Sequence, residues 1–206
     1  WAEKNKERTA VPLSSINSSV GNIVTKLQKQ LKVESQGNSN FDMLLREQAL
    51  LDRETGAGNR EFFNSRLEAL LKEEGAHGAI LFLQFKGLDV VQSLYGKEHA
   101  LTLLNALVNT VTYRLAHLPN YFIARRGEFE LALLLPDCYV KETEKLATRL
   151  MNNILSVTLP IGVSYDEFAH IGISFFQSST TAYQVMSEAD MALRSAQLQG
   201  PSQWFM

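Results

Sequence analysis

The turn Arg126-Gly127-Glu128 places charged side chains between two apolar runs of the chain. Tyr121–Ala124 precedes this turn and Phe129–Leu135 follows it. Two β-type runs joined by a short turn that contains glycine predict a β-hairpin. Such a turn presents polar groups at a sheet edge, where an arginine can pair with phosphate and a carboxylate can bind a divalent cation. The alternative is an ordinary surface hairpin with a solvated glutamate.

The periodicity of the apolar residues predicts an α/β arrangement of elements around this hairpin. We expect helices over residues 60–72, 88–94, 97–115, 141–155 and 180–199, and strands over 79–85, 159–163, 169–176 and 202–206. The continuous apolar run over 79–85 is typical of a central strand that is covered on both faces.

Residues 1–50 form a separate segment, which we predict to be a helical linker that resembles a HAMP-like unit or a signalling helix. Its apolar residues are spaced three or four apart, which gives one stripe on a helix: Ile16, Val20, Ile23, Val24, Leu27 and Leu31. Gly37 interrupts the pattern, and a second stripe restarts at Phe41. Because the first stripe has no evident core within the chain, we expect it to pair as a coiled coil in a homodimer. The alternative is a helical hairpin that folds back on the domain.

The composition excludes several classes of protein. The 206 residues include 20 basic and 22 acidic side chains, a balance that does not favour an electrostatic nucleic-acid binder. Cys138 is the single cysteine, so no internal disulfide can form, which fits a reducing compartment. The four histidines, His77, His99, His117 and His170, lack metal-ligand spacing, and we expect His170 to be a hydrogen-bonded structural residue. No run approaches the length of about 18 apolar residues that a membrane span requires.

Four motifs in order carry a resemblance to a known family. The run from Leu51 to Arg60, the pair Tyr95-Gly96, the hairpin, and the closing helix from Ser187 to Gly200 resemble those of GGDEF domains, which have the diguanylate cyclase fold. The resemblance covers residues 51–206 and implies a nucleotidyl-cyclase-like α/β sandwich with a mixed, largely antiparallel sheet. The abrupt beginning of the chain at Trp1 leads us to expect a piece of a longer protein.

The residues that carry catalysis in this family differ here. The family condenses two GTP molecules into cyclic di-GMP and holds divalent cations with two acidic residues. The resemblance places them at Gln84 and Gly127, and it places the two signature glycines at Arg125 and Arg126. Only Glu128 and Phe129 remain of the signature. An amide is a poor Mg²⁺ ligand, so we expect no catalytic residue, metal site or cofactor.

The nucleotide-recognition positions differ as well. The resemblance places the two guanine-binding residues at Gln92 and Leu101, and leucine cannot accept a hydrogen bond from guanine. Residues 116–119 lack the Arg-x-x-Asp of the product-inhibition site. We therefore expect weak or no binding of GTP and cyclic di-GMP.

Details of the signature and the C-terminal run are similar to the CsrD/MshH-type regulators, a branch with degenerate GGDEF and EAL domains. That resemblance implies the cytoplasmic portion of an inner-membrane protein, an attached EAL domain outside this sequence, and a role in RNase E-dependent decay of small RNAs that sequester CsrA. The implied partners are EIIA-Glc and the RNase E machinery. Two alternatives remain open: a LapD-like cyclic di-GMP receptor, and a GTP-sensing domain that regulates an attached phosphodiesterase.

Overall fold

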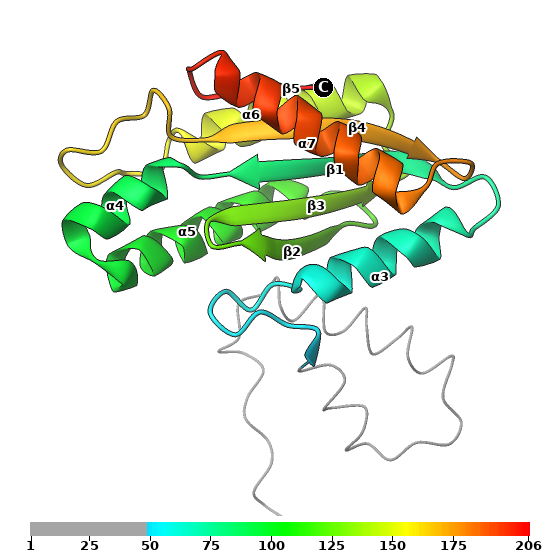
Figure 1. Cartoon of the computed structure of the whole chain (residues 1–206), viewed down its shortest axis with the longest axis horizontal. Coiled ribbons are helices and arrows are strands. Elements are labelled where there is room, and N and C mark those ends of the chain that lie inside the picture. Colours follow the sequence, from blue (N-terminus) through cyan, green and yellow to red (C-terminus); the bar gives the residue numbers. More distant parts are fainter. Residues whose placement is uncertain (1–48) are drawn as a thin grey trace, which may run out of the picture.

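A five-stranded sheet lies at the centre of residues 49–206, the part of the chain that the computed structural model describes. Its strands are β1 (His77–Gln84), β2 (Phe122–Gly127), β3 (Glu130–Pro136), β4 (His170–Gln177) and β5 (Gln203–Phe205). The helices are α3 (Arg60–Leu71), α4 (Gly87–Tyr95), α5 (Lys97–Leu115), α6 (Val140–Ile154) and α7 (Ala182–Leu198) (Figure 1). The predicted linker of residues 1–50 lies almost wholly outside the described residues, and its structure remains a prediction.

The strand order is β2-β3-β1-β4-β5, and all neighbours are antiparallel except β4 and β5, which are parallel. This confirms the predicted mixed, largely antiparallel sheet. β1 is the middle strand, and its six residues from Gly78 to Leu83 are buried. The prediction of a central strand from its unbroken apolar run is therefore confirmed.

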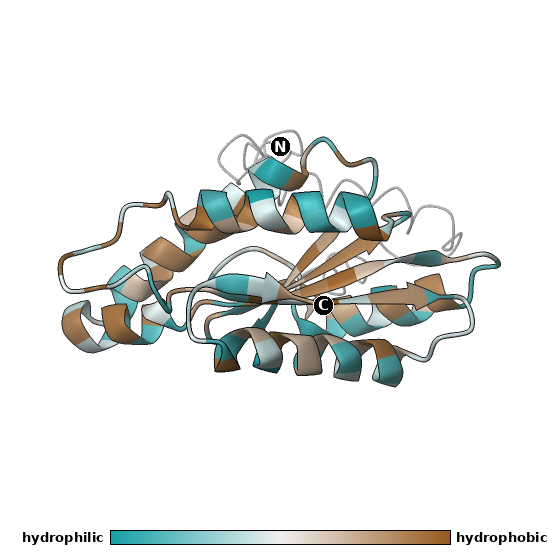
Figure 2. Cartoon of the chain, turned by 90° about the horizontal axis from the view of Figure 1, so that it is seen from above, coloured by the Kyte–Doolittle hydropathy of each residue, from teal (hydrophilic) through white to brown (hydrophobic). Residues whose placement is uncertain are grey.

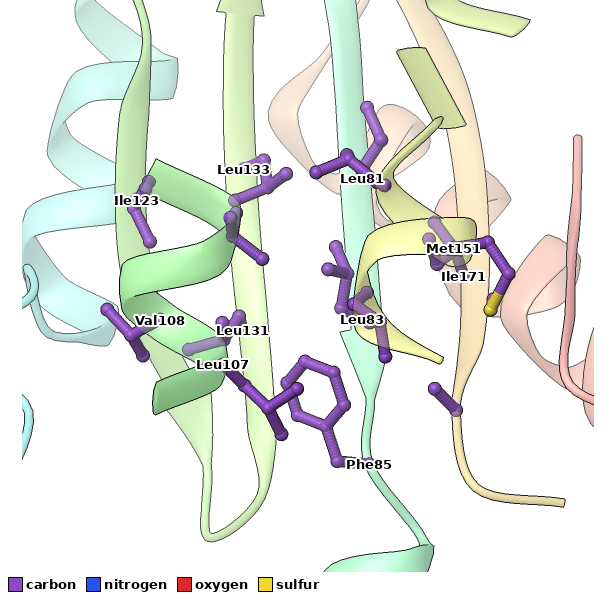
Figure 3. Packing of buried hydrophobic residues seen from close by; sticks show 14 of the residues in the cluster. Leu81, Leu83, Phe85, Leu107, Val108, Ile123, Leu131, Leu133, Met151 and Ile171 are labelled. Carbon is purple, nitrogen blue, oxygen red and sulfur yellow. The ribbon is translucent and has the colours of Figure 1, made fainter. Parts of the chain in front are cut away.

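Helices cover both faces of the sheet, which forms the middle layer of a sandwich (Figure 2). Alternate residues of β1 enter different cores because side chains alternate across a strand. Leu81 and Leu83 face α4, α5 and α6, whereas Ile80 and Phe82 face α3 and α7. Figure 3 shows the first core, in which residues of the sheet meet Leu107 of α5 and Met151 of α6.

One predicted strand is wrong. Residues 159–163 form turns and coil rather than a strand. Pro160 lacks the N–H that a strand ladder uses, and Gly162 has a φ of 86°, which is outside the β region. The Tyr165 hydroxyl lies 3.2 Å from the Leu159 amide nitrogen and donates to the Val157 carbonyl at 3.0 Å, so a side chain takes the place of a neighbouring strand.

The wide turn, residues 51–59, packs against the outer edge of β2. Asp52 closes the turn because its carboxylate accepts hydrogen bonds from the backbone N–H and the hydroxyl of Thr55. The Gly58 amide donates to the Ile123 carbonyl at 3.0 Å, and the Arg125 amide donates to the Gly58 carbonyl at 2.7 Å. The turn thus fixes the position of β2, which carries the two arginines of the hairpin.

Close contact between backbones holds α7 on the sheet. Gly172 lies in β4 under α7, and a Cβ atom built on it would lie 2.2 Å from the Leu193 nitrogen and 2.4 Å from the Ala189 oxygen. No side chain fits there, because real Cβ atoms do not come this close to backbone atoms. Glycine at this position therefore sets the distance between helix and sheet.

Candidate functional site

The hairpin predicted around the polar signature is present, but its turn lies further along the chain than expected. Gly127 pairs with Glu130, so Glu128 and Phe129 form the connection between β2 and β3. Arg126 and Gly127 therefore belong to β2 rather than to the turn, and a bulge separates Arg125 from Gly127. The shift follows from Phe129, whose side chain is buried and whose carbonyl accepts a hydrogen bond from the Phe85 amide at 2.9 Å.

Arg125 joins the hairpin to the wide turn. Its guanidinium forms ion pairs with the carboxylates of Asp52, at 3.3 Å, and Glu54. The same group donates to the carbonyls of Gly127, at 3.1 Å, and Glu128, at 2.8 Å. The hydrogen bond from Arg125 lowers the pKa of Glu54 despite some opposing desolvation. Burial acts to lower the pKa of Arg125, but the hydrogen bond to Glu54 and the charge of Asp52 outweigh it and raise that pKa.

Arg126 joins the hairpin to α7 on the opposite face of the sheet. Its guanidinium lies 3.9 Å from the centre of the Phe82 ring, in cation–π contact. It forms ion pairs with Asp190 of α7 at 2.7 Å and with Glu130 at 3.6 Å. Both arginines of the signature are thus engaged by carboxylates of the domain.

Gln84 lies at the end of β1 and pairs directly with Glu130 in the sheet. Its side-chain N–H₂ group donates to the Glu130 carboxylate at 3.1 Å, and its carbonyl oxygen accepts a hydrogen bond from Gln197 of α7. These hydrogen bonds and ion pairs form one continuous network across the sheet: Gln197, Gln84, Glu130, Arg126 and Asp190. The network begins near the C-terminal end of α7 and ends at the middle of the same helix.

The remaining signature position, Glu128, lies exposed at the tip of the hairpin. Glu128 lies near Asp89, which is in the first turn of α4. Burial raises the pKa of Asp89, and the negative charge of Glu128 raises it further. Within residues 49–206, no group of three or more His, Cys, Asp or Glu side chains is placed to hold a metal ion.

The two positions assigned to guanine recognition lie on adjacent helices. Gln92 is in α4, and Leu101 is in α5, where it packs against the core. The side-chain oxygen of Gln92 is buried without a hydrogen-bond partner among the described residues. His170 lies in β4 with Nε2 3.0 Å from the Gly200 carbonyl, which confirms that it is a hydrogen-bonded structural residue.

Sequence reasoning did not assign roles to Glu130, Asp190 or Gln197. Glu130 carried a usable signal, because a charged residue inside an apolar strand requires a partner. Asp190 and Gln197 are seven residues apart in the closing helix, a spacing that places them on the same helical face. Their partners on β1, β2 and β3 could not be read from that spacing.

Comparison with known proteins identifies the family. The model of "Diguanylate cyclase, GGDEF domain" matches residues 49–203. The chain belongs to the GGDEF family. Among curated proteins, this GGDEF domain is 28% identical over 181 residues to the RNase E specificity factor CsrD of Escherichia coli (strain K12). The match covers 86% of the chain but only 28% of the length of that relative.

Solved structures share the fold of this GGDEF domain. The coiled coil and GGDEF domain of DgcB from Caulobacter crescentus, solved with c-di-GMP, superposes with a TM-score of 0.69 at 19% identity over 94% of this chain and 98% of that one. The S helix-GGDEF-EAL portion of LapD from Vibrio cholerae, bound to c-di-GMP, has a TM-score of 0.65 at 21% identity over 76% of this chain and 36% of that one. At these identities the matches establish the fold alone, and they confirm the nucleotidyl-cyclase-like sandwich.

Proposed function

We propose that this GGDEF domain makes no cyclic di-GMP and acts as a regulatory module of a larger protein. The observation that carries the proposal is the environment of Gln84, where the family resemblance places a metal-binding aspartate. The amide oxygen of Gln84 accepts from Gln197, and its nitrogen donates to Glu130. Both ends of the Gln84 amide are thus engaged, and they link α7 to β3.

The donor set at this point does not suit a divalent cation. Mg²⁺ and Mn²⁺ favour carboxylate oxygens, and Glu130 is the carboxylate next to Gln84. The N–H₂ group of Gln84 and the guanidinium of Arg126 both approach that carboxylate. A cation would have to displace these donors and then lie beside the positive charge of Arg126.

The second acidic position is also unsuited to metal binding. The resemblance places it at Gly127, and a Cβ atom on this residue would lie 3.2 Å from the Glu130 carboxylate. An acidic side chain there would repel Glu130, because like charges at short range are destabilising. Leu101, at a guanine-recognition position, offers no hydrogen bond, which supports weak or no binding of GTP and cyclic di-GMP.

Incubation with GTP and Mg²⁺ or Mn²⁺, followed by chromatography, tests the loss of catalysis. We expect no cyclic di-GMP above a no-protein control, while an active family member assayed in parallel makes product. Calorimetry should give dissociation constants above roughly 10 μM for GTP and for cyclic di-GMP. Product formation contradicts the proposal; tight GTP binding without turnover points instead to the GTP-sensing alternative, and tight cyclic di-GMP binding to a receptor role.

The similarity to CsrD supports a finer proposal for the full-length protein. We infer that it promotes RNase E-dependent decay of small RNAs that sequester CsrA, with an EAL domain beyond residue 206 and with EIIA-Glc or the RNase E machinery as partners. On this proposal residues 51–206 form a degenerate GGDEF domain on the cytoplasmic side of the inner membrane, and residues 1–50 form the helical linker that pairs two chains. No helix among residues 49–206 is long and apolar enough to cross a membrane.

The half-lives of these small RNAs after transcription is stopped test the finer proposal in the source organism. We expect longer half-lives when the gene is deleted and recovery when the full-length gene is restored. A restored gene that carries Arg125→Met measures whether the GGDEF domain contributes. Unchanged half-lives after deletion contradict the role in RNA decay and leave the prediction about cyclic di-GMP synthesis unaffected.

A further inference from the structure

The outward face of α5 carries no charge over about four turns. Leu107 and Val108 of this helix point into the core (Figure 3), and the residues on the opposite side face solvent. The stretch from His99 to Tyr113 contains no lysine, arginine, aspartate or glutamate. Charged residues of α5 occur only at its two ends: Lys97, Glu98 and Arg114. In contrast, the exposed faces of the other long helices carry charges, such as Glu68 of α3, Arg149 of α6 and Arg194 of α7.

Two threonines on this face satisfy their hydroxyl groups within the helix. The hydroxyl of Thr102 donates to the Glu98 carbonyl at 2.9 Å, and that of Thr110 donates to the Ala106 carbonyl at 2.9 Å. Covering these residues therefore leaves no hydroxyl donor unpaired, so the cost of removing them from water is small. Ala106 lies exposed midway between His99 and Tyr113, and a small side chain at that point lets another helix approach closely.

A groove of about 440 Å³ lies beside the N-terminal half of this face, between α4, α5 and the loop before β4. The Tyr95 hydroxyl donates to the Ile161 carbonyl at 2.6 Å, which holds that loop against α4. The apolar lining of the groove comes from all three segments: Val91, Leu103, Ala106 and Pro160. On the C-terminal half of the same helix, the side chain of Tyr113 projects into solvent and is 80% exposed.

A groove and a projecting ring on one helix fit a second copy of that helix. Residues seven apart lie on nearly the same line of a helix, so His99, Ala106 and Tyr113 share the middle of the face. When two copies of α5 pack antiparallel about Ala106, Tyr113 of each copy lies opposite His99 of the other, because both are seven residues from Ala106. Helical side chains lean toward the N-terminus of their own helix, which directs each ring toward the groove of the other copy. In a parallel pair the two rings would meet each other and both grooves would stay open.

We propose that the outward face of α5 is a pairing surface for a second copy of this chain, with the helices antiparallel and Tyr113 of each copy in the groove of the other. Such a contact is isologous, because the same patch serves both copies. The missing charges suit a two-fold axis, since a charged residue near the axis would meet the like charge of its own copy. The surface does not depend on the proposed role in RNA decay.

The size of the face indicates weak pairing. The stretch from His99 to Tyr113 is about 21 Å long, and a contact through one helix of each chain belongs with the interfaces below about 1,200 Å², which are weak. We expect a dissociation constant of about 1 mM for separate domains, so residues 41–206 stay largely monomeric at about 100 μM. A short linkage raises the effective concentration to the millimolar range. The surface therefore pairs when another contact, such as the predicted linker, already joins two chains.

Disulfide trapping in the 206-residue chain tests the surface. Ala106→Cys places a thiol next to its own copy, so mild oxidation at about 1 mM protein should give a covalent dimer. The matched control Ala69→Cys, at an exposed alanine of α3, should form a dimer at least about tenfold more slowly. Cys138 is buried and is common to all variants, so any reaction of its own appears equally in each.

Two further positions report the direction of the helices. In an antiparallel pair, His99 lies about 21 Å from its own copy, and the same holds for Tyr113. A disulfide requires Cα atoms within about 7 Å. Neither His99→Cys nor Tyr113→Cys alone should therefore form a covalent dimer, whereas the chain with both substitutions should. A parallel pair would give a dimer with each single variant.

Tyr113→Ala measures the contribution of the ring in the groove. In the Ala106→Cys chain it should slow disulfide formation about tenfold, because the buried aromatic contact is lost. Tyr183→Ala removes a tyrosine of α7 that is 81% exposed and should leave the rate unchanged. Adding Leu27→Asp should raise the protein concentration that is needed without changing which positions react, which separates the linker from this surface.

Three results would each overturn the proposal: equal rates for Ala106→Cys and Ala69→Cys, a covalent dimer of His99→Cys alone, or equal effects of the two tyrosine variants. The absence of a dimer at about 1 mM would also overturn it, and labelling of the Ala106→Cys thiol by maleimide then identifies the occupant. Slow labelling shows that another part of the same chain covers the face. Fast labelling shows a face that is open to a different protein.

Discussion

Replacing Arg125 with methionine should weaken the contact between the wide turn and the hairpin and lower the stability of the domain. Methionine keeps an unbranched apolar stem but removes the guanidinium. That change deletes the ion pairs with Asp52 and Glu54 and the hydrogen bonds to the carbonyls of Gly127 and Glu128. The backbone pairing between the wide turn and β2 is left in place.

The expected loss follows from how far these groups are exposed. The Arg125 side chain is 10% exposed, whereas those of Asp52 and Glu54 are 21% and 38% exposed. Breaking a buried ion pair costs about 3–5 kcal/mol, and breaking an exposed pair costs about 0–1 kcal/mol. Water can solvate the two carboxylates after the change, so we expect the free energy of unfolding to fall by about 2 kcal/mol. For a domain of this size, the melting temperature should fall by about 4–8 °C.

The loss should depend on pH. The hydrogen bond from Arg125 lowers the pKa of Glu54 in the folded state below its ordinary value of 4.5. A carboxylate with a lowered folded-state pKa stabilises the fold above its unfolded-state pKa, and this contribution disappears as the pH falls through the folded-state pKa. The difference in stability between the wild type and Arg125→Met should therefore be largest near neutral pH and shrink below about pH 4.

Urea denaturation of the wild type, Arg125→Met, Glu54→Gln and the double variant measures both quantities. The double-mutant cycle should give a coupling energy of about 1 kcal/mol at pH 7 and less at pH 3.5. Arg53→Met is the matched control, because Arg53 is an exposed arginine of the same turn. A loss under about 0.5 kcal/mol, or no coupling to Glu54, would refute the view that Arg125 holds the two segments together.

Three further outcomes are expected. Gly172→Ala should lower the free energy of unfolding by about 3 kcal/mol or more in urea denaturation, because a Cβ there meets the α7 backbone. The control Gly75→Ala has open space around it at a φ of 72° and should lower that free energy by only about 1 kcal/mol. Equal losses for the two variants would contradict the packing argument. Gly127→Asp should yield no cyclic di-GMP from GTP and should reduce stability, because its carboxylate would lie beside Glu130; recovered synthesis would show that the metal site needs only this acid. Light scattering should show a dimer for residues 1–206 and a monomer for residues 41–206, because a helix as short as the predicted linker needs a partner for its apolar face. Leu27→Asp should shift the full chain toward the monomer. A monomeric full chain at about 100 μM would contradict pairing through the linker.

Local patterns were sufficient to predict most of the elements. The run over 79–85 predicted β1 and its central position, because both of its faces are buried in the two cores. The periodicity over 97–115 gave the bounds of α5. The predicted strand at 159–163 was wrong because Leu159 and Val163 reach the core from a loop. Ile161 between them is exposed, and the Tyr165 side chain supplies hydrogen bonds that a strand would obtain from its neighbour.

The candidate site was harder to predict, because its contacts join residues far apart in the chain. The sequence predicted that Arg125 and Arg126 would replace the signature glycines, but not that they point to opposite sides of the sheet. Their partners, Asp52 and Asp190, are 73 and 64 positions away. Only the strand register and the helix placement bring such pairs together, so the role of each arginine emerges at the level of the tertiary structure.

The pairing of the wide turn with β2 has a consequence for assembly. An edge strand with free N–H and C=O groups is a template for strand addition by another chain. On β2, the Ile123 carbonyl and the Arg125 amide are already bonded to Gly58. A strand from another chain would have to displace the wide turn and break the ion pairs of Arg125 before it could pair with β2. The opposite edge is formed by β5, which has only three residues and pairs with His170–Gly172 of β4.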